Sequence, residues 1–213
     1  MRLSPSILPV LFAATLLAAP AAHAEMEMSA PPAGSAKLAA TDAALRSLWG
    51  NHIFWVRNVV LATLAKNTAE AKVAEGEVVA DAHGIADAIK PFYGDAAGEA
   101  LFGLLAGHYG TIKAYLTATA AGDKQGQETA TADLLANADK IATFLSGANP
   151  NLPKDAVLGM LQAHGGHHIG QIQQLKAGRY AEEAKTWAEM QAHMNMIADA
   201  LTGAIAKQFP DKF

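Results

Sequence analysis

Two histidines four residues apart, His164 and His168, are the residues of this chain whose spacing most clearly suggests chemistry. They fall in the same apolar series as Val157, Leu161 and Leu175, which marks the buried face of a helix. Residues at this spacing project from one side of a helix with Cβ atoms about 5–6 Å apart, so both rings can direct a nitrogen at one point. This pattern is typical of two ligands to one metal ion.

A second interpretation is that these histidines are ordinary core residues. A single buried histidine usually has a hydrogen-bond partner and no further role. Here two histidines are in register, and Gln171 follows them in the same series. Burying imidazoles without partners costs about 1–3 kcal/mol each, so a cation or a closed polar network must satisfy them. The spacing favours the cation.

Two other expected helices carry a histidine in the middle of their buried series. His52 holds this position in a helix expected over 41–66, and His108 holds it in a helix expected over 95–121. A helical bundle brings the inward faces of its helices together, and metal sites in bundles are built from such inward side chains. The histidines of three helices are therefore expected to converge.

We prefer His52 as the third ligand, because Trp49 and Trp55 flank it and would exclude water from one side. His108 is then a fourth ligand or a partner just outside the ligands, and the sequence leaves the choice between His52 and His108 open. Other residues that could orient the ligands from outside are Gln171, His167 and His193. His83 lies beside the buried series of its helix and is a weak candidate.

The expected ligands indicate the class of metal. Three neutral imidazoles suit Zn²⁺, Ni²⁺, Fe²⁺ or Cu²⁺ and leave a coordination position open. Copper would be favoured if Met190 or Met194 approached the histidines, because thioethers select Cu(I). A zinc hydrolase normally needs a general base as well, and the inward series of the helix expected over 153–178 contains no Asp or Glu. The sequence therefore leans against an enzyme.

The run from His164 through His167 and His168 to Gln171 resembles the H-x3-H-x-G-Q motif of the DinB-like superfamily of metal-binding helical bundles. In that family the two spaced histidines bind a divalent metal together with a third histidine from an earlier helix. The resemblance implies that His164 and His168 are ligands. Some members are metal-dependent thiol transferases, but thiol cofactors of that type are cytosolic, which conflicts with the export signal described below.

Two segments outside this motif are similar to a group of uncharacterised bacterial helical proteins. They are residues 48–55, LWGNHIFW, and the ending QFPDKF at 208–213. This resemblance implies a helical fold and no particular activity.

The N-terminal residues predict export. Residues 1–24 combine Arg2, an apolar run and a small-residue ending, which is typical of a secretory signal peptide cleaved after Ala24. The protein is then expected in the periplasm or secreted, with no membrane attachment after cleavage. The chain has no cysteine, which excludes disulfides, Cys-ligated zinc and covalently attached c-type haem. The formal net charge of −4 and the scattered lysines do not suggest nucleic acid as a partner.

The remaining pattern predicts one all-α domain. Residues 25–40 are expected to be a flexible tail and residues 41–213 a single up-and-down helical bundle, with four core helices and one or two additional ones. The expected helices span 41–66, 67–90, 95–121, 129–145, 153–178 and 181–209. A homodimer is one assembly that the sequence leaves open.

These observations favour an exported bundle that binds a transition metal for sensing, storage or delivery. A DinB-like metal-dependent enzyme, either a transferase or a hydrolase, is the main alternative. A b-type haem-binding bundle with axial histidines and a non-catalytic scaffold are further alternatives.

Overall fold

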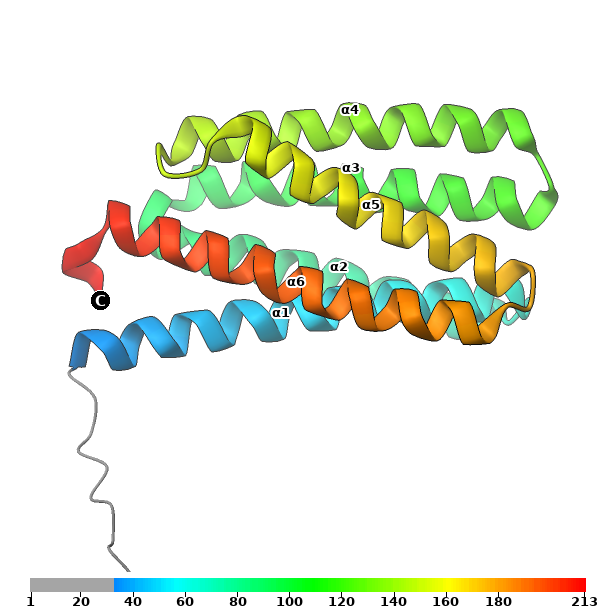
Figure 1. The fold of residues 1–213 in the computed structure, drawn as a ribbon, viewed down its shortest axis with the longest axis horizontal. Helices are drawn as coiled ribbons and strands as arrows, with labels where there is room; N and C mark the ends of the chain where they lie inside the picture. The colour runs from blue at the N-terminus through cyan, green and yellow to red at the C-terminus, as the bar shows by residue number, and fades with distance from the viewer. Residues whose placement is uncertain (1–32) are drawn as a thin grey trace, which may run out of the picture. The chain divides into compact units, whose positions relative to one another are not determined.

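The computed structural model describes residues 33–213 as six long helices that run alternately up and down, followed by one short 3₁₀ turn (Figure 1). The prediction of an all-α up-and-down bundle is therefore confirmed. The expected signal peptide, and the expected tail as far as residue 32, lie outside the described residues. The helices are α1 (Ala33–Leu64), α2 (Thr68–Tyr93), α3 (Asp95–Ala121), α4 (Lys124–Ala148), α5 (Lys154–Lys176) and α6 (Tyr180–Gln208).

Each helix packs against the one before it, and α6 returns to pack against α1. The helix α5 also contacts α1 and α3, in addition to its neighbours α4 and α6. It therefore touches four other helices, and side chains on its inward face meet those of α1 and α3. This is the helix that carries His164 and His168.

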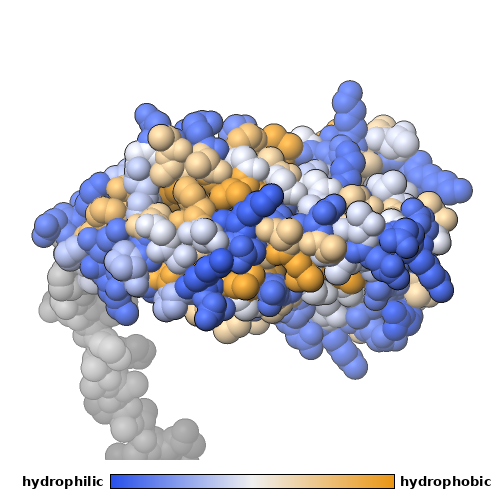
Figure 2. All heavy atoms as spheres, turned by 90° about the horizontal axis from the view of Figure 1, so that it is seen from above, coloured by the Kyte–Doolittle hydropathy of each residue, from blue (hydrophilic) through white to orange (hydrophobic). Residues whose placement is uncertain are grey.

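The interior is apolar, and the outer faces are mixed. Among the largest fully buried side chains are Ile53, Ile85, Ile112, Ile172 and Met190, which come from five different helices. The face seen in Figure 2 is largely hydrophilic, with apolar residues between the charged ones. Within residues 33–213, no helix is both long enough and apolar enough to cross a membrane.

Several helix ends follow from local sequence. Asn67 caps α2, since its side-chain oxygen accepts from the Glu70 backbone N–H at 3.2 Å and its amide donates to the Glu70 carboxylate at 2.8 Å. This reciprocal pair of bonds is a capping box. Helix α3 begins at Asp95 as expected, and Gly178 follows α5 with a positive φ of 70°, a conformation that glycine adopts without strain.

Several helix boundaries differ from the sequence prediction. Helix α1 begins at Ala33, so residues 33–40, expected in the tail, are helical; Ala, Lys and Leu in this stretch are strong helix formers. The prediction that the fourth helix begins at residue 129 is wrong, because Asp123 caps α4 by accepting from the Gly126 N–H at 2.9 Å and the helix begins at Lys124. The prediction that α2 ends before Pro91 is also wrong, because the helix includes Pro91 in its last turn and tolerates the one backbone N–H that proline lacks.

The two adjacent glycines of α5 have different surroundings. A Cβ added at Gly165 would lie 3.0 Å from Leu134 Cδ2, so this glycine allows α4 to approach closely. A Cβ added at Gly166 would meet nothing within 4 Å among the described residues. Gly165 is therefore required by packing, whereas Gly166 only lowers helix propensity.

We expect Gly166→Ala to raise the free energy of unfolding by about 0.5–1 kcal/mol, because alanine removes the flexibility of glycine in an open helical position. Gly165→Ala gains the same propensity but must displace Leu134. It should be less stable than Gly166→Ala by about 1 kcal/mol. Urea unfolding of both variants measures the difference, and equal stabilities would contradict the close approach of α4.

Candidate metal centre

Three buried histidines from two helices meet in the interior of the bundle. His52 is on α1, and His164 and His168 are on α5. One ring nitrogen of each lies within 4.8 Å of the other two. Nitrogens around a tetrahedral ion with bonds of 2.0–2.1 Å are roughly 3.4 Å apart, so small side-chain rotations would bring the set to coordination distance.

The ring contacts show how the helices position these side chains. The His164 and His168 rings are 4.5 Å apart between centroids, as expected for residues one turn apart on one helix face. The His52 ring lies 5.8 Å from the His164 ring and 6.1 Å from the His168 ring. Trp49 meets the His52 ring edge-on at 6.0 Å and covers it, as the sequence predicted for this tryptophan.

His108 of α3 lies next to this group without belonging to it. Its ring stacks at 5.4 Å on that of His164 and lies 6.5 Å from that of His168. Of the two candidates for the third position, the structure therefore groups His52 with His164 and His168. His108 lies outside this group, against the ring of His164. The roles of all four as ligands or supporting residues stay a prediction.

Burial keeps these imidazoles neutral. It lowers the pKa of His52 to about 3, with a smaller contribution from repulsion by His108. It lowers the pKa of His108 to about 4, partly offset by the side chain of Asn137. The pKa values of His164 and His168 also fall well below the ordinary value, first through burial and then through their histidine neighbours. Neutral imidazoles are the form that binds metal ions.

Six nitrogens of these four rings are buried and lack a hydrogen-bond partner among residues 33–213. The nitrogens without one are His52 Nδ1, His168 Nε2, and both nitrogens of His108 and His164. A closed polar network, the alternative to a cation, would require hydrogen bonds between the rings or to neighbouring groups. The arrangement instead leaves lone pairs unused in an apolar interior, which fits a divalent transition metal.

Gln171 belongs to a polar group that the sequence did not reveal. Its amide donates at 3.1 Å to Glu183 of α6, a carboxylate only 2 % exposed. Arg57 of α1 makes two bonds to the same carboxylate, from Nε at 2.6 Å and from Nη2 at 2.8 Å. Hydrogen bonds from Arg57 hold the pKa of Glu183 below its usual range. These residues tie together α1, α5 and α6, the first two of which carry the ligands.

The remaining predicted histidines form contacts of their own. His167 and His193 lie 5.5 Å apart, and His193 Nε2 is 2.8 Å from the carbonyl oxygen of Met160. The exposed His83 stacks on Phe102 at 3.7 Å. Neither His167 nor His193 belongs to the group of three histidines whose ring nitrogens lie close together.

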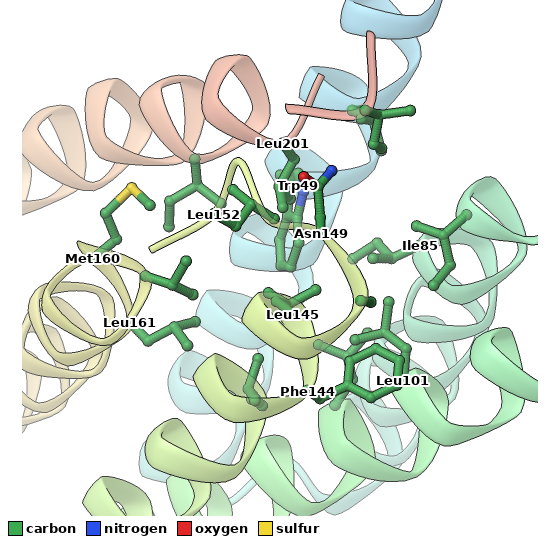
Figure 3. Close-up of a pocket in the computed structure, with 18 of the residues that line it drawn as sticks. Trp49, Ile85, Leu101, Phe144, Leu145, Asn149, Leu152, Met160, Leu161 and Leu201 are labelled. Carbon is green, nitrogen blue, oxygen red and sulfur yellow. The ribbon is translucent and has the colours of Figure 1, made fainter. Parts of the chain in front are cut away.

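An apolar cavity of about 60 Å³ adjoins the histidines (Figure 3). His52, His108 and His164 contribute to its wall, and most of the other lining residues are aliphatic or aromatic. In Figure 3 Trp49, Leu101, Phe144, Leu145 and Leu161 surround this space. Leaving it empty costs about 1–2 kcal/mol at ~24 cal/mol per Å³. Sequence patterns do not reveal such a cavity, because its aliphatic and aromatic lining residues have the pattern of ordinary core.

Comparison of the chain with protein-family models, with curated proteins and with solved structures gives no significant match. The interpretation of the site therefore depends on its own geometry and chemistry.

Acid is expected to destabilise the metal-free protein. In the unfolded chain these histidines bind protons near pH 6.5. In the folded protein, burial holds the pKa of His52 at about 3 and that of His108 at about 4. The unfolded state thus binds more protons below about pH 6.5, and each such histidine lowers the free energy of unfolding by about 1.4 kcal/mol per pH unit.

Urea unfolding of the metal-free protein between about pH 7.5 and pH 5 measures this slope. His108→Phe should reduce it by the contribution of one histidine. An unfolding free energy that does not change with pH would contradict the neutral state of the rings.

Removing Arg57 should destabilise the fold more than removing a surface arginine. Arg57→Met leaves the buried Glu183 without its counter-charge and should cost about 2–3 kcal/mol, less than a fully buried pair because the Arg57 side chain is 31 % exposed. Arg46, which pairs with Asp42 and Asp199 at the surface, is the matched control. Arg46→Met should cost less than about 1 kcal/mol in thermal or urea unfolding. Equal costs would show that the buried pair has no special role.

Proposed function

We propose that this protein is an exported helical bundle that binds one transition-metal ion through His52, His164 and His168, for sensing, storage or delivery of the metal. The observation that carries the proposal is the group of three buried nitrogens within 4.8 Å of one another. Burial of the neutral rings and the unpartnered nitrogens around them support it.

Export and the family resemblance add to the proposal from the sequence. Residues 1–24 have the pattern of a secretory signal peptide, and a cysteine-free set of ligands resists the oxidising conditions outside the cytoplasm. The H-x3-H-x-G-Q run at 164–171 resembles the metal-binding motif of DinB-like bundles, and the described helices supply the earlier-helix histidine that such a site requires.

The donor set suits Zn²⁺, Ni²⁺, Fe²⁺ or Cu²⁺ and leaves at least one coordination position for another ligand. In this chain, α5 supplies the adjacent pair of imidazoles and α1 supplies the third. Trp49 and the surrounding aliphatic residues exclude bulk water. The Arg57–Glu183–Gln171 group holds α1, α5 and α6 in place around them.

A DinB-like metal-dependent enzyme is the second candidate, and the cavity beside His52 and His164 favours it, since a substrate could sit there. Metal binding without catalysis accounts for more of the site. The residues lining the cavity within the described chain include no carboxylate that could serve as a general base.

We expect the purified mature protein to bind about one metal ion per chain, and His168→Ala and His52→Ala to lose this binding. His108→Phe should retain it, because His108 lies outside the group of three. His83→Ala, a change at an exposed histidine, is the matched control and should also retain it. Metal content by mass spectrometry, together with metal-dependent thermal stabilisation, measures the result.

Equal metal content in the wild type and His168→Ala would rule out this site. Loss of metal binding in His108→Phe, with retention in His52→Ala, would mean that His108 and not His52 is the third ligand. A Soret band in the absorption spectrum of the purified protein would move the function to haem binding.

A further inference from the structure

The cavity adjoins two of the three grouped histidines. His52 and His164 line the cavity and also belong to the proposed ligands. A ligand in the cavity can therefore reach the coordination position that three imidazoles leave open. The lining also includes the half-buried Phe144, Leu145 and Leu201 (Figure 3).

Charge determines which ligand fits this position. Neutral imidazoles leave a divalent ion with its full charge in an apolar interior, where an uncompensated charge is costly. The cavity wall, as far as residues 33–213 form it, contains no Asp, Glu, Lys or Arg. The buried Glu183 is already paired with Arg57. An anion bound to the metal would supply the missing negative charge.

The cavity wall also offers a donor to such an anion. Trp49 is 7 % exposed, lines the cavity, and has no hydrogen-bond partner for its Nε1–H among the described residues. A buried indole N–H usually has an acceptor. A carboxylate has acceptor oxygens to spare after binding a metal ion, and an apolar tail would match the rest of the wall.

We propose that the cavity binds a short-chain monocarboxylate, whose carboxylate occupies the open position on the metal and whose apolar tail fills the space lined by residues of all six helices. This rests on the proposed function, because the carboxylate is held by the metal. The size follows from the volume: a water-sized group needs about 10–15 Å³ by this kind of measure, so 60 Å³ holds roughly four or five heavy atoms. Butyrate fits this limit, because one of its six heavy atoms is the oxygen on the metal and five remain in the cavity, whereas hexanoate would place seven there.

The test uses the full-length mature protein loaded with Co²⁺, whose visible absorption changes when its ligands change. Acetate, propionate, butyrate and hexanoate are titrated in turn. Affinity should rise roughly fourfold for each methylene buried, which gives about 15-fold from acetate to butyrate, and should rise no further for hexanoate. Neutral 1-butanol should bind far more weakly than butyrate.

Two substitutions of the lining residue Leu105 change the volume available to the apolar tail in opposite directions. Leu105→Phe fills the space beside His108 and should remove the preference for butyrate over acetate while Co²⁺ still binds. Leu105→Ala enlarges the space and should move the optimum to hexanoate, which keeps the proposal testable if the larger side chain prevents folding. Leu135→Phe, the same substitution at a residue 45 % exposed on α4, should leave the series unchanged.

The two proposals fail in different ways. If Co²⁺ binds and no carboxylate changes its spectrum, or butyrate binds no better than acetate, the ligand proposal is overturned and the metal site stands. If Co²⁺ does not bind, both are overturned.

Discussion

Four neutral imidazole rings packed into the interior of a helical bundle impose the constraint on which the rest of this structure depends. Each ring has at least one buried nitrogen without a hydrogen-bond partner among the described residues, and burial together with repulsion between neighbouring rings disfavours their protonated forms. A cation shared by three of them removes this cost in one step. The packing of α5 against α1 and α3, and the Arg57–Glu183 pair between α1 and α6, keep the rings close enough for that.

Local sequence was sufficient for most of the fold. The caps at Asn67 and Asp123 and the glycine after α5 are short-range signals that act through backbone hydrogen bonds and φ. Asp123 is a residue type that commonly caps helices, but the polar residues after it made the predicted start of α4 too late. The prediction at Pro91 was wrong because a proline removes only one backbone N–H bond from a helix, and the packing of α2 outweighs that local loss near the end of the helix.

The candidate site was partly predictable for a similar reason. His164 and His168 are related by helical spacing, which the sequence states directly. The choice between His52 and His108 depends on how α1 and α3 are rotated against α5, and no local pattern contains that information. Glu183 and Arg57 are 126 residues apart, and nothing in either neighbourhood indicates the other. The cavity is a further tertiary property, since it arises where ordinary core side chains fail to fill the space.

The position of the ligands on α1 and α5 also sets an order of events for the newly made protein. Of the three grouped nitrogens, only those of His164 and His168 lie near each other before the bundle forms, in any conformation that retains one helical turn. The third nitrogen arrives only when the first helix and the fifth have docked, after most of the chain between them has been organised. If these three nitrogens bind a metal ion as proposed, selection among competing ions waits until α1 and α5 have docked, and the compartment in which the chain folds determines which metals are available.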